Sequence, residues 1–378
     1  MRTLSHPQQN YLPNEANVTE SKPLRILHIL NDVREVGNGI INTAIDIAWG
    51  QAQLGQIVAV ASGGGEYEQL LEKSNIKHYL LDQKRTPISL LLAIGRLQNI
   101  IKEFQPDIVH CHMMTGIVLA KLLHRPQKFR LVAHIQNVHQ PSSILMGLAE
   151  RTIPVSQAVA DDMSKRGVPK EKMRVVRNLN LSSPRLPSID NCAIAQLQQP
   201  AIVTVAGMYK RKGIAELISA FTLVSKRFPT AHLYLVGDGP DRQYFEALAA
   251  ASSVSDRIHF EGFQKNPQAY MRAAHIFVLA SHRESFGIVL VEARQAGCAI
   301  IASNIDGIPE ALDHGEAGVL VTPGDVKALA DALEMLLANP SEQEKWQQAA
   351  QQNLDRLTVV KMVEEVMAVY NDVLANKN

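Results

Sequence analysis

Short apolar runs of strand length alternate with helix-length segments along most of the 378 residues. This alternation is typical of parallel sheets covered by helices on both faces, because a parallel connection needs a crossover long enough for a helix. In the first half, the expected strands are Arg25–Leu30, Ile57–Ser62, His78–Leu81, Ile108–His112, Leu131–Ile135, Ile153–Ser156 and Arg174–Arg177. In the second half, they are Ala201–Ala206, His232–Val236, Arg257–Phe260, Ile276–Ser281, Ala299–Ser303 and Gly318–Val321. The clearest expected helices are Ile40–Gln53, Ile88–Phe104 and Val359–Leu374.

The rhythm breaks once, between Leu181 and Pro200, where three prolines lie among serines and other polar residues. We therefore predict an α/β protein of two doubly wound, Rossmann-like domains. Facing each other, such domains would bind ligands in a cleft between the C-terminal edges of their sheets. The predicted parts are a disordered tail (1–23), an N-terminal domain (24–182), a linker (183–200), a C-terminal domain (201–358) and a final helical segment (359–378).

Composition excludes several classes of protein. The formal net charge is +1, so no overall field attracts nucleic acid. Three scattered cysteines, Cys111, Cys192 and Cys298, argue for a reducing compartment without disulfides or a cysteine-based zinc site. The apolar runs are shorter than the ~20 residues of a spanning helix, and residues 1–22 lack the apolar centre of a signal peptide. We expect a cytoplasmic protein.

Two carboxylates, Glu284 and Glu292, stand eight residues apart around a Phe-Gly step. An expected strand precedes them, and the apolar segment Gly287–Ala296, closed by Gly297, has the pattern of a helix. Glu284 then lies in the loop and Glu292 inside the helix, whose N-terminus can receive a phosphate. An anion site with a carboxylate on either side suits a sugar nucleotide. Carboxylates near a helix start also occur for purely structural reasons.

A second glycine loop, Gly37-Asn-Gly39, follows the first expected strand and opens a helix. Glycines there let backbone N–H groups approach a phosphate. A dinucleotide fingerprint would need a third glycine, but Asn42 stands there, and an acid at the end of the second strand, where Ser62 stands. NAD is therefore disfavoured, and a plain tight turn is the alternative.

Three consecutive cations, Lys210, Arg211 and Lys212, lie between Gly207 and Gly213 at an expected strand-to-helix turn. Facing the cleft, they could neutralise a leaving diphosphate; a solvated basic turn is the alternative. No Asp-x-Asp occurs, and no His, Cys or carboxylate set has metal-ligand spacing. We thus expect no metal and no cofactor, with cationic side chains and a helix N-terminus stabilising the diphosphate.

Polar side chains end two neighbouring expected strands. His110 and His112 close one of them, and His134, Gln136 and His139 surround the end of the next. Hydrogen-bonding groups at strand C-termini fit the rim of a substrate cleft, although each is also common as a structural residue.

Taken in order, these segments make the chain similar to the retaining GT-B glycosyltransferases of family 4 (glycosyl transferases group 1). The similar segments are Pro106–His112, Val155–Ala160, Val175–Asn178, Gly207–Gly213, Val236–Pro240, Phe260–Gly262, Ser281–Glu292 and Gly307–Glu310. The resemblance extends from Arg25 to Leu374 and implies a GT-B architecture, with the final helix returning to an acceptor-binding N-terminal domain.

The resemblance implies roles for particular residues. Lys212 would hold the donor diphosphate, Glu292 the ribose hydroxyls, and Glu284 the hydroxyls of the transferred sugar. Backbone N–H groups of Phe286, Gly287 and Ile288 would lie near the phosphates, and Gly39 would bring the N-terminal backbone against them. The same donor site would include Gly207 and Arg211. His112, Gln136 and His139 would stand on the acceptor side.

The sequence departs from the family pattern at several places. Met208 stands where a basic residue is usual, so Lys210 or Arg211 would have to supply the second phosphate cation. Gln136 stands where a histidine is common. The usual Asn-Gly step is Asn178-Leu179, and Ser285 replaces the usual glycine after the first glutamate.

We therefore expect a retaining, metal-independent hexosyl- or N-acetylhexosaminyl-transferase. It would move sugar from a nucleoside diphosphate to a glycan or lipid-linked acceptor, in polysaccharide or lipopolysaccharide assembly, with peripheral contact to the inner face of a membrane and no nucleic-acid partner. The alternatives are a GT-B epimerase or phosphorylase, and an inactive nucleotide-sugar-binding partner.

Overall fold

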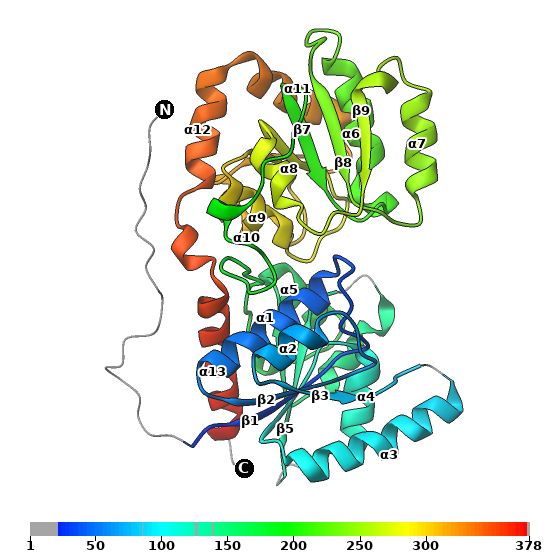
Figure 1. Ribbon diagram of the computed structural model, residues 1–378, viewed down its shortest axis with the longest axis vertical. Coiled ribbons are helices and arrows are strands. Elements are labelled where there is room, and N and C mark those ends of the chain that lie inside the picture. Colours follow the sequence, from blue (N-terminus) through cyan, green and yellow to red (C-terminus); the bar gives the residue numbers. More distant parts are fainter. Residues whose placement is uncertain (1–21, 85, 125–127, 138–139, 376–378) are drawn as a thin grey trace.

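The computed structural model describes residues 22–84, 86–124, 128–137 and 140–375, so residues 1–21 of the predicted tail and His139 lie outside the described residues. Two six-stranded parallel sheets, each covered by helices, stack along the long axis of the molecule (Figure 1). They are two doubly wound, Rossmann-like domains, as the sequence predicts.

The N-terminal domain has the strand order β3-β2-β1-β4-β5-β6. Its strands are β1 (Arg25–Ile29), β2 (Ile57–Ser62), β3 (Lys77–Leu80), β4 (Ile108–Cys111), β5 (Arg130–Ile135) and β6 (Arg151–Pro154). Its helices are α1 (Gly39–Gln53), α2 (Glu68–Lys73), α3 (Pro87–Phe104), α4 (Met114–Leu123) and α5 (Gln157–Lys165). The buried strands are continuous apolar runs because helices cover both faces.

The C-terminal domain repeats this winding with the order β12-β11-β10-β7-β8-β9. Its strands are β7 (Ala201–Val205), β8 (His232–Val236), β9 (Ile258–Gly262), β10 (Ile276–Leu279), β11 (Ala299–Ser303) and β12 (Val319–Val321). Its helices are α6 (Ile214–Val224), α7 (Arg242–Ala250), α8 (Gln268–Ala273), α9 (Ile288–Ala296), α10 (Ile308–Ala311), α11 (Val326–Ala338) and α12 (Pro340–Ala350).

One expected strand, Arg174–Arg177, is wrong. The segment runs beside β6, where the N–H groups of Arg174 and Val176 donate to Thr152 and Pro154 at 3.0 Å each. Only the pair Thr152 and Met173 forms a bridge. Pro154 has no N–H to donate, so a regular ladder cannot continue along this edge.

Helix α13 (Val359–Ala375) leaves the C-terminal domain and packs on the N-terminal one, against α1, β5 and β6 (Figure 1). Its approach to α1 needs a glycine, because a Cβ at Gly50 would lie 2.6 Å from Val363 Cγ2. The two chain crossings between the domains run side by side: Leu181 N donates to Leu357 O at 3.2 Å, and Val359 N donates to Leu181 O at 2.9 Å.

Candidate active site

The turn between β7 and α6 places Lys212 at the C-terminal edge of the second sheet. Gly213 has φ +66°, and a Cβ there would lie 1.8 Å from the Ala280 carbonyl oxygen, so only glycine lets this turn lie against the end of β10. Lys212 consequently reaches the loop after β10 and forms an ion pair with Glu284. The two side chains are 14% and 15% exposed, so the pair is partly open to solvent.

Glu284 lies in the loop between β10 and α9, as the sequence predicts. Asp306 holds this loop from the next connection, because its carboxylate accepts from the Glu284 N–H at 3.0 Å and from Arg283 Nε at 2.9 Å. The Gly307 N–H donates to the Glu284 carbonyl at 3.1 Å. The backbone of Glu284 is therefore fixed on both sides, while its carboxylate faces Lys212.

Helix α9 begins at Ile288 after Gly287, whose φ of +88° favours glycine, and it ends at Ala296, where Gly297 closes it as predicted. Like any α-helix, it leaves the N–H groups of its first turn without intrahelical acceptors. Buried Phe286 precedes this turn. The open N-terminus of α9 thus follows directly on the Lys212–Glu284 pair, an arrangement that can bind an anion.

Glu292 lies one turn into α9 and faces the N-terminal domain. Its Oε1 accepts a hydrogen bond from Asn180 Nδ2 at 2.5 Å. Burial raises the pKa of Glu292 to about 7, although Arg185 and the Asn180 amide favour the charged form. The carboxylate is therefore an acceptor whose charge changes near neutral pH.

The three cations of the turn are not equivalent. The Lys210 ammonium lies 4.9 Å from the centre of the Tyr244 ring, and the Arg211 guanidinium 5.3 Å from that of Tyr209. A Cβ at Gly207 would lie 2.9 Å from the Tyr209 ring, so a glycine gives this ring its space. Of these three cations, only Lys212 forms an ion pair with a carboxylate of the site.

The N-terminal domain contributes the loop before α1. The Asn38 side chain caps α1 by accepting from the Ile40 N–H at 3.0 Å, and a Cβ built on Gly39 would meet open space. Nearby, Lys265 Nζ of the C-terminal domain bonds Glu35 at 2.8 Å. The loop therefore reaches across to the second domain, with an uncrowded backbone at Gly39.

Helix α5 fixes the two domains to each other beside this site. The Ser156 hydroxyl donates to the Ser285 carbonyl at 2.7 Å, next to Glu284. Glu310 accepts from the N–H groups of Gln157 and Ala158 at 3.0 and 3.2 Å, so a carboxylate of one domain caps a helix of the other.

Two of the predicted acceptor residues, Gln136 and His112, lie in the described ranges, and both are buried. Gln136 Oε1 accepts from Asn178 Nδ2 at 3.0 Å, which leaves the Gln136 Nε2 donor without a partner among the described residues. His112 Nε2 lies 2.9 Å from His28 Nδ1, and its Nδ1 has no partner in the described part of the chain.

Three residues that position the site are not among those predicted from the sequence for a role in it: Asn180, Asp306 and Glu310. Glu310 lies in a segment that carries the resemblance, but neither its own spacing nor that of the other two indicates a partner. Their partners lie 22 to 153 residues away, so only the fold brings them together.

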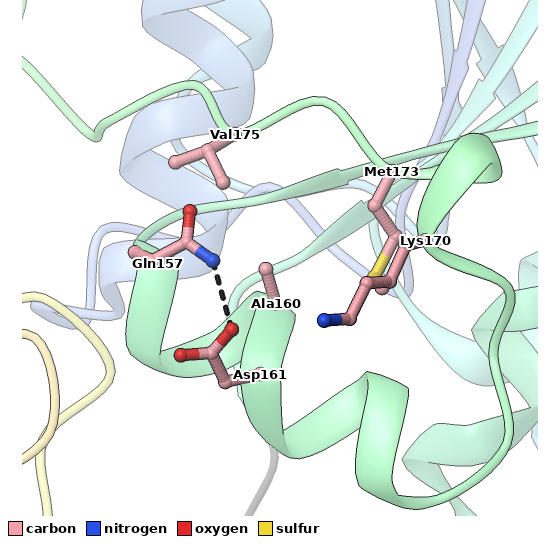
Figure 2. A pocket seen from close by; sticks show the side chains of 6 residues that line it. All are labelled: Gln157, Ala160, Asp161, Lys170, Met173 and Val175. Atoms are coloured by element: carbon pink, nitrogen blue, oxygen red, sulfur yellow. Dashed lines mark hydrogen bonds between the residues drawn. The ribbon is translucent and has the colours of Figure 1, made fainter.

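A separate small pocket lies beside α5, where Gln157 Nε2 donates to Asp161 and the aliphatic parts of Lys170 and Met173 form another wall (Figure 2). Its volume of about 150 Å³ is too small for a nucleotide sugar. None of the helices in the described ranges is long and apolar enough to cross a membrane.

Comparison with known proteins identifies the chain. Residues 193–353 match the family Glycosyl transferases group 1, and residues 37–179 match Glycosyltransferase Family 4. The chain belongs to the group 1 glycosyltransferases of the GT-B fold. Over 266 residues this glycosyltransferase is 27% identical to the lipopolysaccharide core biosynthesis glycosyltransferase LpsD of Rhizobium meliloti (strain 1021). The aligned region covers 69% of this chain and 74% of LpsD.

Solved structures support the fold of this glycosyltransferase. HepE of Anabaena, in complex with UDP and glucose, has a TM-score of 0.78 at 20% identity, covering 92% of this chain and 99% of its own. WaaG, a glycosyltransferase involved in lipopolysaccharide biosynthesis, has a TM-score of 0.71 at 17% identity, covering 91% and 99%.

Proposed function

We propose that this protein is a retaining, metal-independent glycosyltransferase of lipopolysaccharide or polysaccharide assembly. It would transfer a hexose or N-acetylhexosamine from a nucleoside diphosphate to a glycan or lipid-linked acceptor. The observation that carries the proposal is the Lys212–Glu284 pair at the open start of α9, with Glu292 one turn further. LpsD supports the class of acceptor, and HepE, solved with UDP, makes uridine diphosphate sugars the first donors to test.

The ion pair suggests how a donor would bind. Without ligand, the Lys212 ammonium neutralises the Glu284 carboxylate. An arriving diphosphate, together with the first N–H groups of α9, would compete for that ammonium and release Glu284 to accept sugar hydroxyls. Glu292 would then exchange the Asn180 amide for ribose hydroxyls. The donor thus replaces contacts that already exist instead of burying unpaired charges.

Retention requires attack from the face that the diphosphate leaves. The bond between the anomeric carbon and the phosphate oxygen breaks, the bond to the acceptor oxygen forms on the same face, and the acceptor proton passes to a departing phosphate oxygen. Lys212 and the N-terminus of α9 stabilise the negative charge that develops on the diphosphate. On the acceptor side, Gln136 Nε2, which has no partner in the described part of the chain, would donate to a sugar hydroxyl.

The proposal is tested by a thermal-shift screen of sugar nucleotides without added metal, because a ligand that binds only the folded state raises its melting point. We expect at least one nucleoside diphosphate sugar to raise it, and an acceptor extract to give transfer with retained anomeric configuration. Binding without transfer to any extract would favour an inactive partner. Release of an epimerised sugar or phosphate-dependent cleavage would favour the two enzyme alternatives.

Glu292→Gln should weaken binding of that sugar nucleotide by about 1.5–3 kcal/mol, the value of a charge-assisted hydrogen bond, without unfolding the protein. Because the charged form is the better acceptor and the pKa is about 7, wild-type affinity should fall from pH 8 to pH 6. The variant cannot titrate, so its affinity should stay constant. Titration calorimetry at both pH values checks this, with Glu316→Gln, an exposed carboxylate of the same domain, as the control. Unchanged affinity with a lower melting point would mean that Glu292 is only structural.

Peripheral membrane contact is proposed for the start of α3. Ile88, Leu91 and Leu92, spaced to share one face, are 73%, 70% and 70% exposed, and Arg96 follows one turn later. The helix lies at the outer edge of the N-terminal domain, away from the C-terminal domain (Figure 1). Exposed leucines beside a cation fit the surface of an anionic bilayer.

Leu91→Glu should therefore abolish most co-sedimentation with vesicles that contain anionic lipid, because a charge replaces the inserted side chain. Leu223→Glu, at a leucine 49% exposed on α6, is the matched control and should sediment like the wild type. Equal sedimentation of both variants would refute the contact.

A further inference from the structure

Four histidines gather inside the N-terminal domain. They come from three adjacent strands: His28 from β1, His110 and His112 from β4 and its end, and His134 from β5. His28 pairs with His110 in register, and alternate residues of a strand point to the same face. The rings therefore meet on one face of the sheet, and all four side chains are buried.

The rings come within coordination range of one another. One ring nitrogen from each of His28, His110 and His112 lies within 4.8 Å of the others, and the ring centres are 4.3 to 5.2 Å apart. Neutral imidazoles are preferred ligands of zinc-like ions.

Two ring nitrogens of the cluster have hydrogen-bond partners outside it. His28 Nε2 lies 2.8 Å from Gln51 Oε1, and His110 Nδ1 lies 2.7 Å from the Tyr370 hydroxyl, to which Gln51 Nε2 donates at 3.1 Å. Because the Gln51 oxygen can only accept, His28 Nε2 carries the proton and His28 Nδ1 the lone pair, which accepts from His112 Nε2. A metal ion would replace this hydrogen bond, with the outer contacts holding the rings in place. His110 Nε2 is buried and has no partner within the described ranges.

The third ligand completes the set. His112 Nε2 lies 2.9 Å from His28 Nδ1, slightly closer than the ~3.3 Å between two nitrogens that share a tetrahedral zinc at about 2.0–2.1 Å each. Small ring rotations would therefore admit an ion between them. Both nitrogens of His134 are buried without a partner among the described residues, and its ring centre lies 5.4 Å from that of His110, so this ring borders the three-histidine set.

We propose that the N-terminal domain binds one zinc-type divalent ion through His28, His110 and His112, beyond any role in glycosyl transfer. The site lies beneath α1, which carries Gln51, and α13, which carries Tyr370. An ion there would tie β1 and β4 to each other and, through these two hydrogen-bonded side chains, to the helix that returns from the C-terminal domain. Its effect is on stability, and the diphosphate chemistry does not use it.

The test uses the full chain with any purification tag removed, because tag histidines bind zinc. Since the site is buried, the protein is unfolded with a chelator and refolded without metal, with Zn²⁺ or with Mg²⁺. We expect one zinc per chain after gel filtration and a melting point at least about 3 °C higher, with no effect of Mg²⁺. In the wild type, Co²⁺ should give the strong visible absorption of a four-coordinate site.

His110→Gln should retain at least about tenfold less zinc, the loss expected when a ligand is removed. His259→Gln is the matched control: its Nε2 lies 3.0 Å from His232 Nδ1 in the C-terminal domain, a second histidine pair that adventitious zinc would favour. Should His110→Gln fail to fold, the wild-type Co²⁺ spectrum decides. No retained zinc, no such spectrum, or loss of zinc only in His259→Gln would each overturn the proposal.

Discussion

Lys212→Ala should lower turnover at saturating donor by about 10²-fold or more, the effect of losing one group that stabilises transition-state charge. The diphosphate gains negative charge as the sugar departs, so the ammonium is worth more in the transition state than in the bound donor. The variant also leaves Glu284 without its cation, and repulsion between this carboxylate and the diphosphate adds to the loss. Donor affinity should therefore fall as well, though less than turnover.

The neighbouring cations are matched controls for this prediction. Lys210 and Arg211 have the same charge in the same turn but lie over tyrosine rings. Their alanine variants should each lose less turnover than Lys212→Ala, unless one of them supplies the cation that Met208 does not. The measurement is initial rate at saturating donor and acceptor, with donor affinity determined separately. Near wild-type turnover in Lys212→Ala together with an inactive Arg211→Ala would contradict the roles assigned to this turn.

The fold follows from the sequence because buried parallel strands are continuous apolar runs. Six of the predicted strands extend one or two residues past the observed end; Leu30 and His112, for example, continue the pattern after pairing stops. The one wrong strand, Arg174–Arg177, has the right residue types. Its failure depends on Pro154 in a neighbouring segment, which local composition does not reveal.

The sequence predicts the position of a site residue where that position depends on its neighbours along the chain. Glu284 in a loop, Glu292 in the following helix and Lys212 before a glycine all follow from spacing. Partners from other segments do not: Asn180 reaches Glu292 across 112 residues, and His28 reaches His112 across 84. The histidine cluster has no metal-ligand spacing in the sequence, because strand register brings it together.

The buried ion pair at the start of the predicted linker is another contact that spacing in the sequence does not reveal. Composition predicts a linker at 183–200, yet its start packs tightly against α1. Arg185 donates to both carboxylate oxygens of Asp46, at 2.7 and 2.8 Å, and the Ser183 hydroxyl donates at 2.6 Å. The Arg185 and Asp46 side chains are 4% and 0% exposed, so water cannot replace either partner.

Asp46→Ala should therefore destabilise the N-terminal domain by about 3–5 kcal/mol, because it leaves the Arg185 guanidinium buried without a counter-charge. Asp331→Ala removes the partner of Lys327 in an exposed pair of similar length, 2.7 Å, and should cost less than about 1 kcal/mol. Urea unfolding followed by Trp49 fluorescence in a Trp346→Phe background reports on α1, which carries Trp49.

Replacing both partners, as in Asp46→Leu with Arg185→Met, should recover most of the loss, since no unpaired charge is then buried. If Asp46→Ala unfolds at the same urea concentration as Asp331→Ala, the pair contributes nothing to holding the crossing segment on α1.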